Sequence, residues 1–251
     1  MSGKYYWTIP LLFSLIFIET GFIFFSYLGF YPVIINGTIV GYAFPLNYLL
    51  FYNTSTGPFS SIFLNNFLWD GWSNAIAFGI YSMVFVVTSM FSFYRVRRAW
   101  FLVIGSVLSA VITGSVIRFY LPPGSVLFGQ SMVLSGYAGI VLFFAIYEAV
   151  CFKWNSFPEL ESIIMKRKYG TGIAAAYFGA YIFVLIFAIG SLYGFFSPGA
   201  PEITRMAHAI ALLTGTVLAG IFTVFFEGEP NWKREKSGPF LITEGEPEVS
   251  L

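Results

Sequence analysis

Charged residues are scarce in this chain. They make up 10% of its 251 residues, against 57% hydrophobic residues, and the mean hydropathy is +0.78. A soluble domain normally carries about 25% charged residues, so this composition excludes one. The formal net charge is only +1, and we expect no nucleic-acid partner. The composition indicates the lipid bilayer as the solvent of most of the chain.

Cysteine and histidine occur once each. Cys151 has no second cysteine, so disulfides within the chain are excluded. No second histidine exists to form a metal-ligand set, and we expect neither a metal nor another cofactor. His208 lies inside an apolar run, residues 206–215, that should sit in a bilayer. An ionisable ring kept there indicates a functional site, because imidazole titrates near neutral pH and accepts a proton from a hydroxyl.

Six apolar stretches are long enough to cross the hydrocarbon as helices, which takes about 20 residues. They cover residues 8–30, 72–94, 99–120, 131–151, 171–194 and 203–226. The first lacks a small-residue cleavage site after it, so we interpret it as a retained span. The sequence therefore predicts an all-α membrane protein, with a six-helix domain over residues 1–227 and a flexible charged tail over residues 228–251.

Eleven of the thirteen lysine and arginine residues flank the spans in a way that predicts one orientation. They are Lys4, Arg95, Arg97, Arg98, Lys153, Lys166, Arg167, Lys168, Lys233, Arg234 and Lys236. Short cytoplasmic loops collect such residues, so we expect a multi-pass protein of the cell membrane with both termini in the cytoplasm. Arg118 and Arg205 remain for the outer side, at span ends where the charged head can snorkel to the interface.

The longest predicted outer segment, residues 31–68, is aromatic and apolar where a solvated loop would be polar. Tyrosine and tryptophan favour the headgroup level of a membrane. We expect this segment to lie in the interface beside the helices.

Ser131 is the candidate partner of His208, because it stands at the predicted start of the span 131–151. Backbone N–H groups at a helix start lack intrahelical acceptors and favour an anionic oxygen, which suits an acyl-transfer nucleophile. Small residues then follow at helical spacing on both spans. They are Ser135 and Gly139 after Ser131, and Ala211 and Gly215 after His208. Two such faces allow the close helix contact that a Ser–His hydrogen bond requires.

Three segments of the chain resemble the rhomboid family of intramembrane serine proteases. Gly129-Gln130-Ser131-Met132 resembles the family's G-x-S-G at the start of its fourth helix, with Met132 as a departure, and Gly139 matches a later glycine of that motif. Ala207-His208, followed by Ala211 and Gly215, resembles the motif of its sixth helix. The resemblance covers most of the chain and implies a six-helix rhomboid-like bundle.

The third segment resembles the family's F-L-H-x-x-W-x-H-x-x-x-N. Phe63-Leu64-Asn65 and Asp70-Gly71-Trp72-Ser73-Asn74 match its spacing, but Asn65 and Asp70 replace both histidines. The resemblance implies that Ser131 attacks the scissile carbonyl, that His208 accepts its proton, and that the Ser131 amide and the Asn74 side chain hold the oxyanion. Family members usually add a histidine where Asp70 stands. Three interpretations stay open: Asp70 points away from the site, activity is low, or the chain is an inactive relative.

Two functions follow from this resemblance. The first is an endopeptidase that cuts transmembrane protein substrates near the outer membrane face, and the alternative is an inactive rhomboid-like protein that binds transmembrane clients. A small transporter is a third interpretation, but the spans show no paired glycine or proline interruptions. Oligomeric state and substrate are not encoded in any pattern we find.

Three alternatives concern single residues. Ser135 is a second candidate nucleophile, although packing, with its hydroxyl bonded to a carbonyl one turn earlier, suits it better. Asn74 as a simple polar contact between helices is weighed about equally with the oxyanion role. Glu19, in the first span, is expected protonated or hydrogen bonded inside the bundle.

Overall fold

The structure is a computed structural model. It describes residues 5–28, 31–35, 38–43, 52–53, 66, 71–89, 94–120, 126–127, 130–154, 179, 182, 186, 189–190, 192 and 202–227. Helices whose bounds fall within these residues lie in five of the six expected ranges. They are α1 (Thr8–Leu28), α4 (Trp72–Thr88), α5 (Arg95–Ile117), α6 (Ser131–Trp154) and α9 (Glu202–Phe222), the last continuing into a π-helix, η3 (Thr223–Glu227). The expected span at 171–194 and the expected tail at 228–251 lie largely or wholly outside the described residues.

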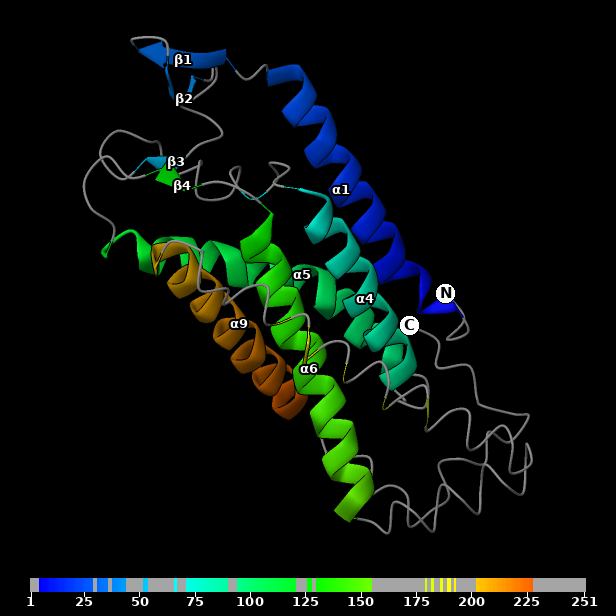
Figure 1. Ribbon diagram of the computed structural model, residues 1–251. Coiled ribbons are helices and arrows are strands. Elements are labelled where there is room, and N and C mark those ends of the chain that lie inside the picture. Colours follow the sequence, from blue (N-terminus) through cyan, green and yellow to red (C-terminus); the bar gives the residue numbers. More distant parts are fainter. Residues whose placement is uncertain are drawn as a thin grey trace.

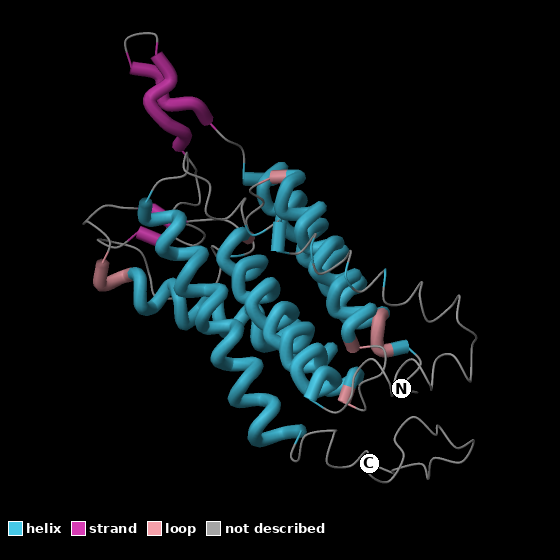
Figure 2. Tube along the Cα trace, turned by 60° about the horizontal axis from the view of Figure 1, so that its bottom comes forward, coloured by secondary structure: helices cyan, strands magenta, loops and turns pink. Residues whose placement is uncertain are grey.

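Three of the described helices are long and apolar enough to cross a membrane: Arg95–Ile117, Ser131–Glu148 and Glu202–Glu227. Thr8–Ile23 and Trp72–Thr88 are shorter apolar helices. The chain is therefore a helical membrane protein, as its composition predicts. The helices pack side by side in one bundle (Figures 1 and 2).

Four short strands lie outside this bundle. β1 (Tyr31–Ile35) and β2 (Thr38–Ala43) form an antiparallel hairpin, with Tyr31 opposite Ala43. β3 (Tyr52–Asn53) pairs with β4 (Val126–Leu127), so the segment after α1 is joined to the segment that leads into α6. Figure 1 shows both pairs beyond the same end of the bundle. They fall in the segment expected at the membrane interface and just before α6, and the apolar patterning did not predict them.

Helix α6 is the centre of the bundle, because α4, α5 and α9 all pack against it (Figure 1). Its residues from Met132 to Leu142 are buried almost without interruption. Gly136 allows this on the α5 side, since a Cβ there would meet the Ser109 hydroxyl and its Cβ. A helix buried on all sides needs apolar residues around its whole circumference, and α6 has them.

Aromatic rings and a chain of hydroxyls join α1, α4 and α6. The rings of Phe13 and Tyr137 are stacked at 6.2 Å between centroids, and Phe78 meets Tyr137 edge-on at 5.4 Å. Beside them the Ser82 hydroxyl lies 3.0 Å from Ser14 Oγ and 2.8 Å from the Tyr137 hydroxyl. These polar groups satisfy one another, which membrane-embedded hydroxyls require.

One acidic residue, Glu19, differs from expectation. Glu19 is exposed on α1 and does not point into the bundle, so the expectation of an interior carboxyl is wrong. An apolar helix carries no periodic signal to show which face turns inward, and the prediction had assumed the inward one. Glu227, the last residue before the predicted tail, is 5% exposed and belongs to the bundle.

Candidate active site

Ser131 is the first residue of α6, as predicted. The amide of Leu134 donates to the carbonyl of Gln130 at 3.0 Å, and this bond opens the helix. The preceding amides, including that of Ser131, therefore belong to the helix start, where the dipole favours negative charge. The fully buried Gln130 side chain donates from Nε2 to the carbonyl of Phe17 at 2.8 Å. This bond fixes the start of α6 against α1.

His208 lies on α9, six residues after its first residue, and is 8% exposed. The neighbouring Ala207 and Ala211 are also buried. The imidazole therefore lies inside the bundle and is not presented to lipid. An ionisable ring inside a membrane bundle normally has a functional reason.

The contacts between α6 and α9 recur at a nearly constant separation in sequence, from 73 positions for Gly139 and Leu212 to 79 for Gly136 and Gly215. The Thr216 hydroxyl lies 3.3 Å from the carbonyl of Gly139, which precedes it by 77 positions. A Cβ at Gly220 would lie 3.6 Å from the ring of Phe143, again 77 positions earlier. Two helices with a nearly constant offset run in the same direction, as Figure 1 shows for α6 and α9. Ser131 and His208 are separated by 77 positions, which lies within this range, so the register brings them to about the same level of the two facing helices.

Two of the small residues predicted to form this contact, Gly139 and Gly215, lie in it. A Cβ at Gly139 would come within 2.2 Å of the Leu212 carbonyl oxygen, and one at Gly215 within 2.3 Å of the Gly136 carbonyl oxygen. Only glycine permits backbones to approach this closely, which is the packing typical of membrane helices. The backbones of α6 and α9 therefore lie close together along this seam, between Gly136 and Gly139 on α6 and Leu212 and Gly215 on α9.

Asn74 lies in the first turn of α4 and is half-buried. Both Phe78 and Ser82, one turn apart, contact Tyr137 on α6. In Figure 1, α4 and α6 run in the same direction, so Asn74 and Ser131 both lie where their helices begin. This end of the bundle, where α4, α6 and α9 begin, is called the Ser131 end below. Asn65, Asp70 and Gly129 lie outside the described residues.

Ser135 takes the packing role that the sequence favoured. Its hydroxyl donates to the carbonyl of Ser131 at 2.7 Å, one turn earlier on α6, and the residue is fully buried. Met132, the departure from the family motif, is 3% exposed and packs in the core. No group of three metal-ligating side chains is found among the described residues.

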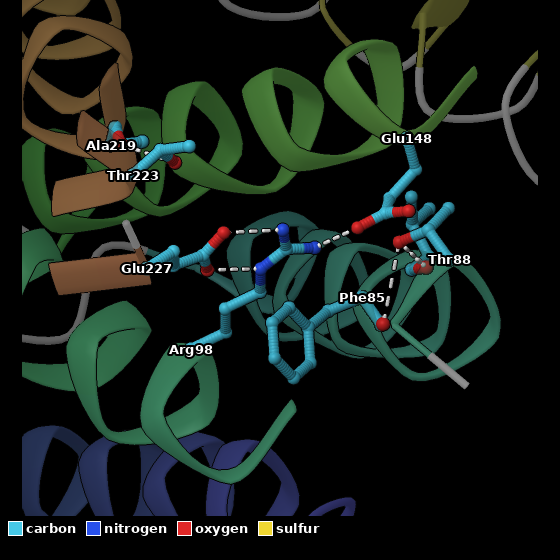
Figure 3. Close-up of polar contacts among 8 residues, drawn as sticks. Phe85, Thr88, Arg98, Glu148, Ala219, Thr223 and Glu227 are labelled. Carbon is cyan, nitrogen blue, oxygen red and sulfur yellow. Dashed lines mark hydrogen bonds and ion pairs between the residues drawn. The ribbon is translucent and has the colours of Figure 1, made fainter. Parts of the chain in front are cut away.

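A buried ion cluster at the opposite end of the bundle was not predicted. Arg98 on α5 is fully buried and donates from Nε and Nη2 to the two carboxylate oxygens of Glu227, at 2.5 and 2.7 Å. Its Nη1 donates to Glu148 on α6 (Figure 3). The guanidinium also lies 4.7 Å from the centre of the Phe144 ring. We call Arg98, Glu148 and Glu227 the ion cluster.

The charge count places Arg98 in a cytoplasmic loop, and Glu227 is the last residue of the predicted six-helix domain. The sequence signal that could have indicated the cluster is Glu148, because an acid inside an apolar span needs a partner. The two carboxylates give each of the three guanidinium nitrogens a charged acceptor, which makes this kind of pairing tolerable away from water.

Comparison with protein-family models, with curated proteins and with solved structures finds no match to this chain.

Proposed function

We propose that the chain is a rhomboid-type intramembrane serine endopeptidase with Ser131 as nucleophile and His208 as base. The observation that supports it most is the parallel register of α6 and α9, from which we infer that the only histidine is about level with a serine at a helix start. The proposal includes a six-helix rhomboid-like bundle, both termini in the cytoplasm, and the Ser131 end at the outer face of the cell membrane. Its substrates are transmembrane proteins.

The reaction follows from the chemistry of the two side chains. His208 accepts the Ser131 hydroxyl proton as Oγ attacks the scissile carbonyl, and then donates that proton to the leaving amine as the C–N bond breaks. Water, activated by the same imidazole, next attacks the acyl ester and releases the acid product with Ser131 restored. The dyad has no carboxylate partner in this scheme.

The oxyanion of each tetrahedral intermediate is assigned to the helix start. The Ser131 amide, at the positive end of α6, and the side-chain amide of Asn74, in the first turn of α4, are the proposed donors. Losing one such donor costs about 10²–10³ in rate. Asp70 replaces the donor histidine of the family, so an ionised Asp70 close to the oxyanion would lower activity.

Activity-based labelling tests the proposal. Purified protein in detergent is treated with a neutral fluorophosphonate probe, alongside an active rhomboid as positive control. Wild type and Ser135→Ala should label, whereas Ser131→Ala and His208→Ala should not. Ser135→Ala is the matched control, because Ser135 lies one turn from Ser131 with its hydroxyl engaged by the backbone.

The absence of labelling would favour the alternative function, an inactive rhomboid-like protein that binds transmembrane clients. Wild type that stays unlabelled while the control enzyme labels refutes the protease proposal. Labelling that survives in His208→Ala also refutes it, because a serine that needs no base is not part of a dyad. Thermal unfolding of each variant confirms that loss of labelling is not loss of the fold.

A further inference from the structure

No ion pair involves Arg205 among the residues that the structure describes. Its Nε is enclosed by protein and has no hydrogen-bond partner within the part of the chain that the structure describes. Glu202, one turn earlier on α9, is exposed, and no ion pair joins it to Arg205 in the described ranges. A buried guanidinium N–H left without an acceptor is costly, so an acceptor is expected to arrive from elsewhere.

Arg118 offers a direct comparison. It caps the end of α5 and is exposed, as expected of an arginine that snorkels to the membrane interface. Arg205 is only half-buried as a residue, yet its Nε is turned into the protein. The exposed Arg118 fits the expected snorkelling, whereas at Arg205 the Nε atom is enclosed by protein.

The position of Arg205 relates it to the candidate active site. Arg205 precedes His208 by three residues, and side chains at this spacing lie on the same face of a helix. The rise of an α-helix places it about 4.5 Å nearer the start of α9. The register of α6 and α9 sets His208 level with Ser131, so Arg205 lies just beyond the dyad at the Ser131 end.

We propose that Arg205 binds a carboxylate of the polypeptide substrate, from an Asp or Glu side chain within a few residues of the scissile bond. This inference rests on the proposed protease function. A planar guanidinium pairs with a carboxylate through two parallel hydrogen bonds, and such charge-assisted bonds are the strong ones. A lipid phosphate is the less suitable partner, because Nε is enclosed by protein and is not presented to lipid.

A binding assay that needs no catalysis tests the site. The background is Ser131→Ala in nonionic micelles, and the ligands are two fluorescent apolar peptides that differ only by Glu against Gln. The Glu peptide should bind about 10-fold or more tightly, as expected for a hydrogen-bonded charged pair. In Arg205→Gln the preference should fall to about 1, and Arg205→Lys should keep part of it. Arg118→Gln, the matched exposed arginine, should leave the preference unchanged.

Attaching the same two peptides to a reactive phosphonate gives probes that test the protease proposal and the Arg205 proposal separately. The ratio of labelling rates, acidic over neutral, should match the binding preference in the protein with Ser131 intact. No labelling of either probe, with the binding preference present, refutes the protease and leaves the Arg205 site in place. Equal binding of both peptides overturns the Arg205 site. A preference for the Glu peptide that appears only in anionic lipid bicelles, and is equal in wild type and Arg205→Gln, also overturns the Arg205 site.

Discussion

Replacing Arg98 by leucine should strongly destabilise the protein. The substitution leaves the carboxylates of Glu148 and Glu227, each 5% exposed, buried without a cation. Removing one partner of a buried pair costs about 3–5 kcal/mol, and one arginine here serves two acids, so we expect the upper part of that range. For a domain of this size each kcal/mol shifts the melting temperature by about 2–4 °C, which gives a loss of roughly 8–20 °C.

Thermal unfolding in detergent, followed by intrinsic fluorescence, measures this loss. Arg97→Leu is the matched control, because Arg97 is exposed on the same turn of α5 and its loss should change stability by no more than about 0.5 kcal/mol. Replacing all three residues of the ion cluster by leucine should restore much of the stability, since apolar replacement of a whole buried cluster is often neutral. Equal melting temperatures for Arg97→Leu and Arg98→Leu, or a triple variant less stable than Arg98→Leu, would refute the reasoning.

Two further predictions concern the helix seam and the N-terminal segment. Gly215→Ala should lower the free energy of unfolding by about 1–3 kcal/mol, because the added Cβ meets the Gly136 backbone. In Gly220→Ala the added Cβ meets only the Phe143 side chain at 3.6 Å, so this change should be neutral or stabilising by up to about 1 kcal/mol. Denaturation of the two variants compares them, and equal effects would contradict the packing. Burial raises the pKa of Tyr6 from 10.0 to about 12, against a lowering by Arg95, and its hydroxyl donates to the Val86 carbonyl at 2.7 Å. Because the pKa of Tyr6 is higher in the folded than in the unfolded protein, its contribution to stability is complete below about pH 10 and should be lost as the pH rises from about 10 to about 12. The melting temperature across that range should fall less in Tyr6→Phe than in wild type. Parallel curves for the two proteins would contradict the assignment.

The sequence predicts most of the helical bundle because apolar length is a strong signal. Helix α5 nevertheless begins at Arg95, four residues before the expected 99, because charged residues interrupt an apolar stretch without interrupting a helix. The start of α6 at Ser131 and the back-bonded hydroxyl of Ser135 are confirmed, since both depend on local chemistry. The paired strands β3 and β4 are two residues each and lie far apart in sequence, too short to produce an alternating pattern.

Contacts that depend on small side chains could be predicted from the sequence. Ion pairs between residues far apart in the sequence could not. Glycine spacing anticipates the contact of α6 with α9, because small residues at helical intervals have few other uses in a membrane helix. The ion cluster joins Arg98 to Glu227, which is 129 positions later. A charge count treats every arginine beside a span as exposed to water, so it cannot identify the one that folding encloses. The roles of Asn65 and Asp70 stay predictions from sequence.

The ion cluster also sets an order of events during biosynthesis. Chains are made from the N terminus, so Arg98 and Glu148 are synthesised well before Glu227. Until the π-helical turn is in place, the Arg98 guanidinium pairs only with Glu148, and its Nε and Nη2 lack the acceptors that Glu227 later supplies. Glu227 closes that side with two hydrogen bonds from the π-helical turn that ends α9. A nascent chain lacking this turn therefore displays an incompletely paired arginine, the kind of feature by which cellular quality control distinguishes unfinished membrane proteins from finished ones.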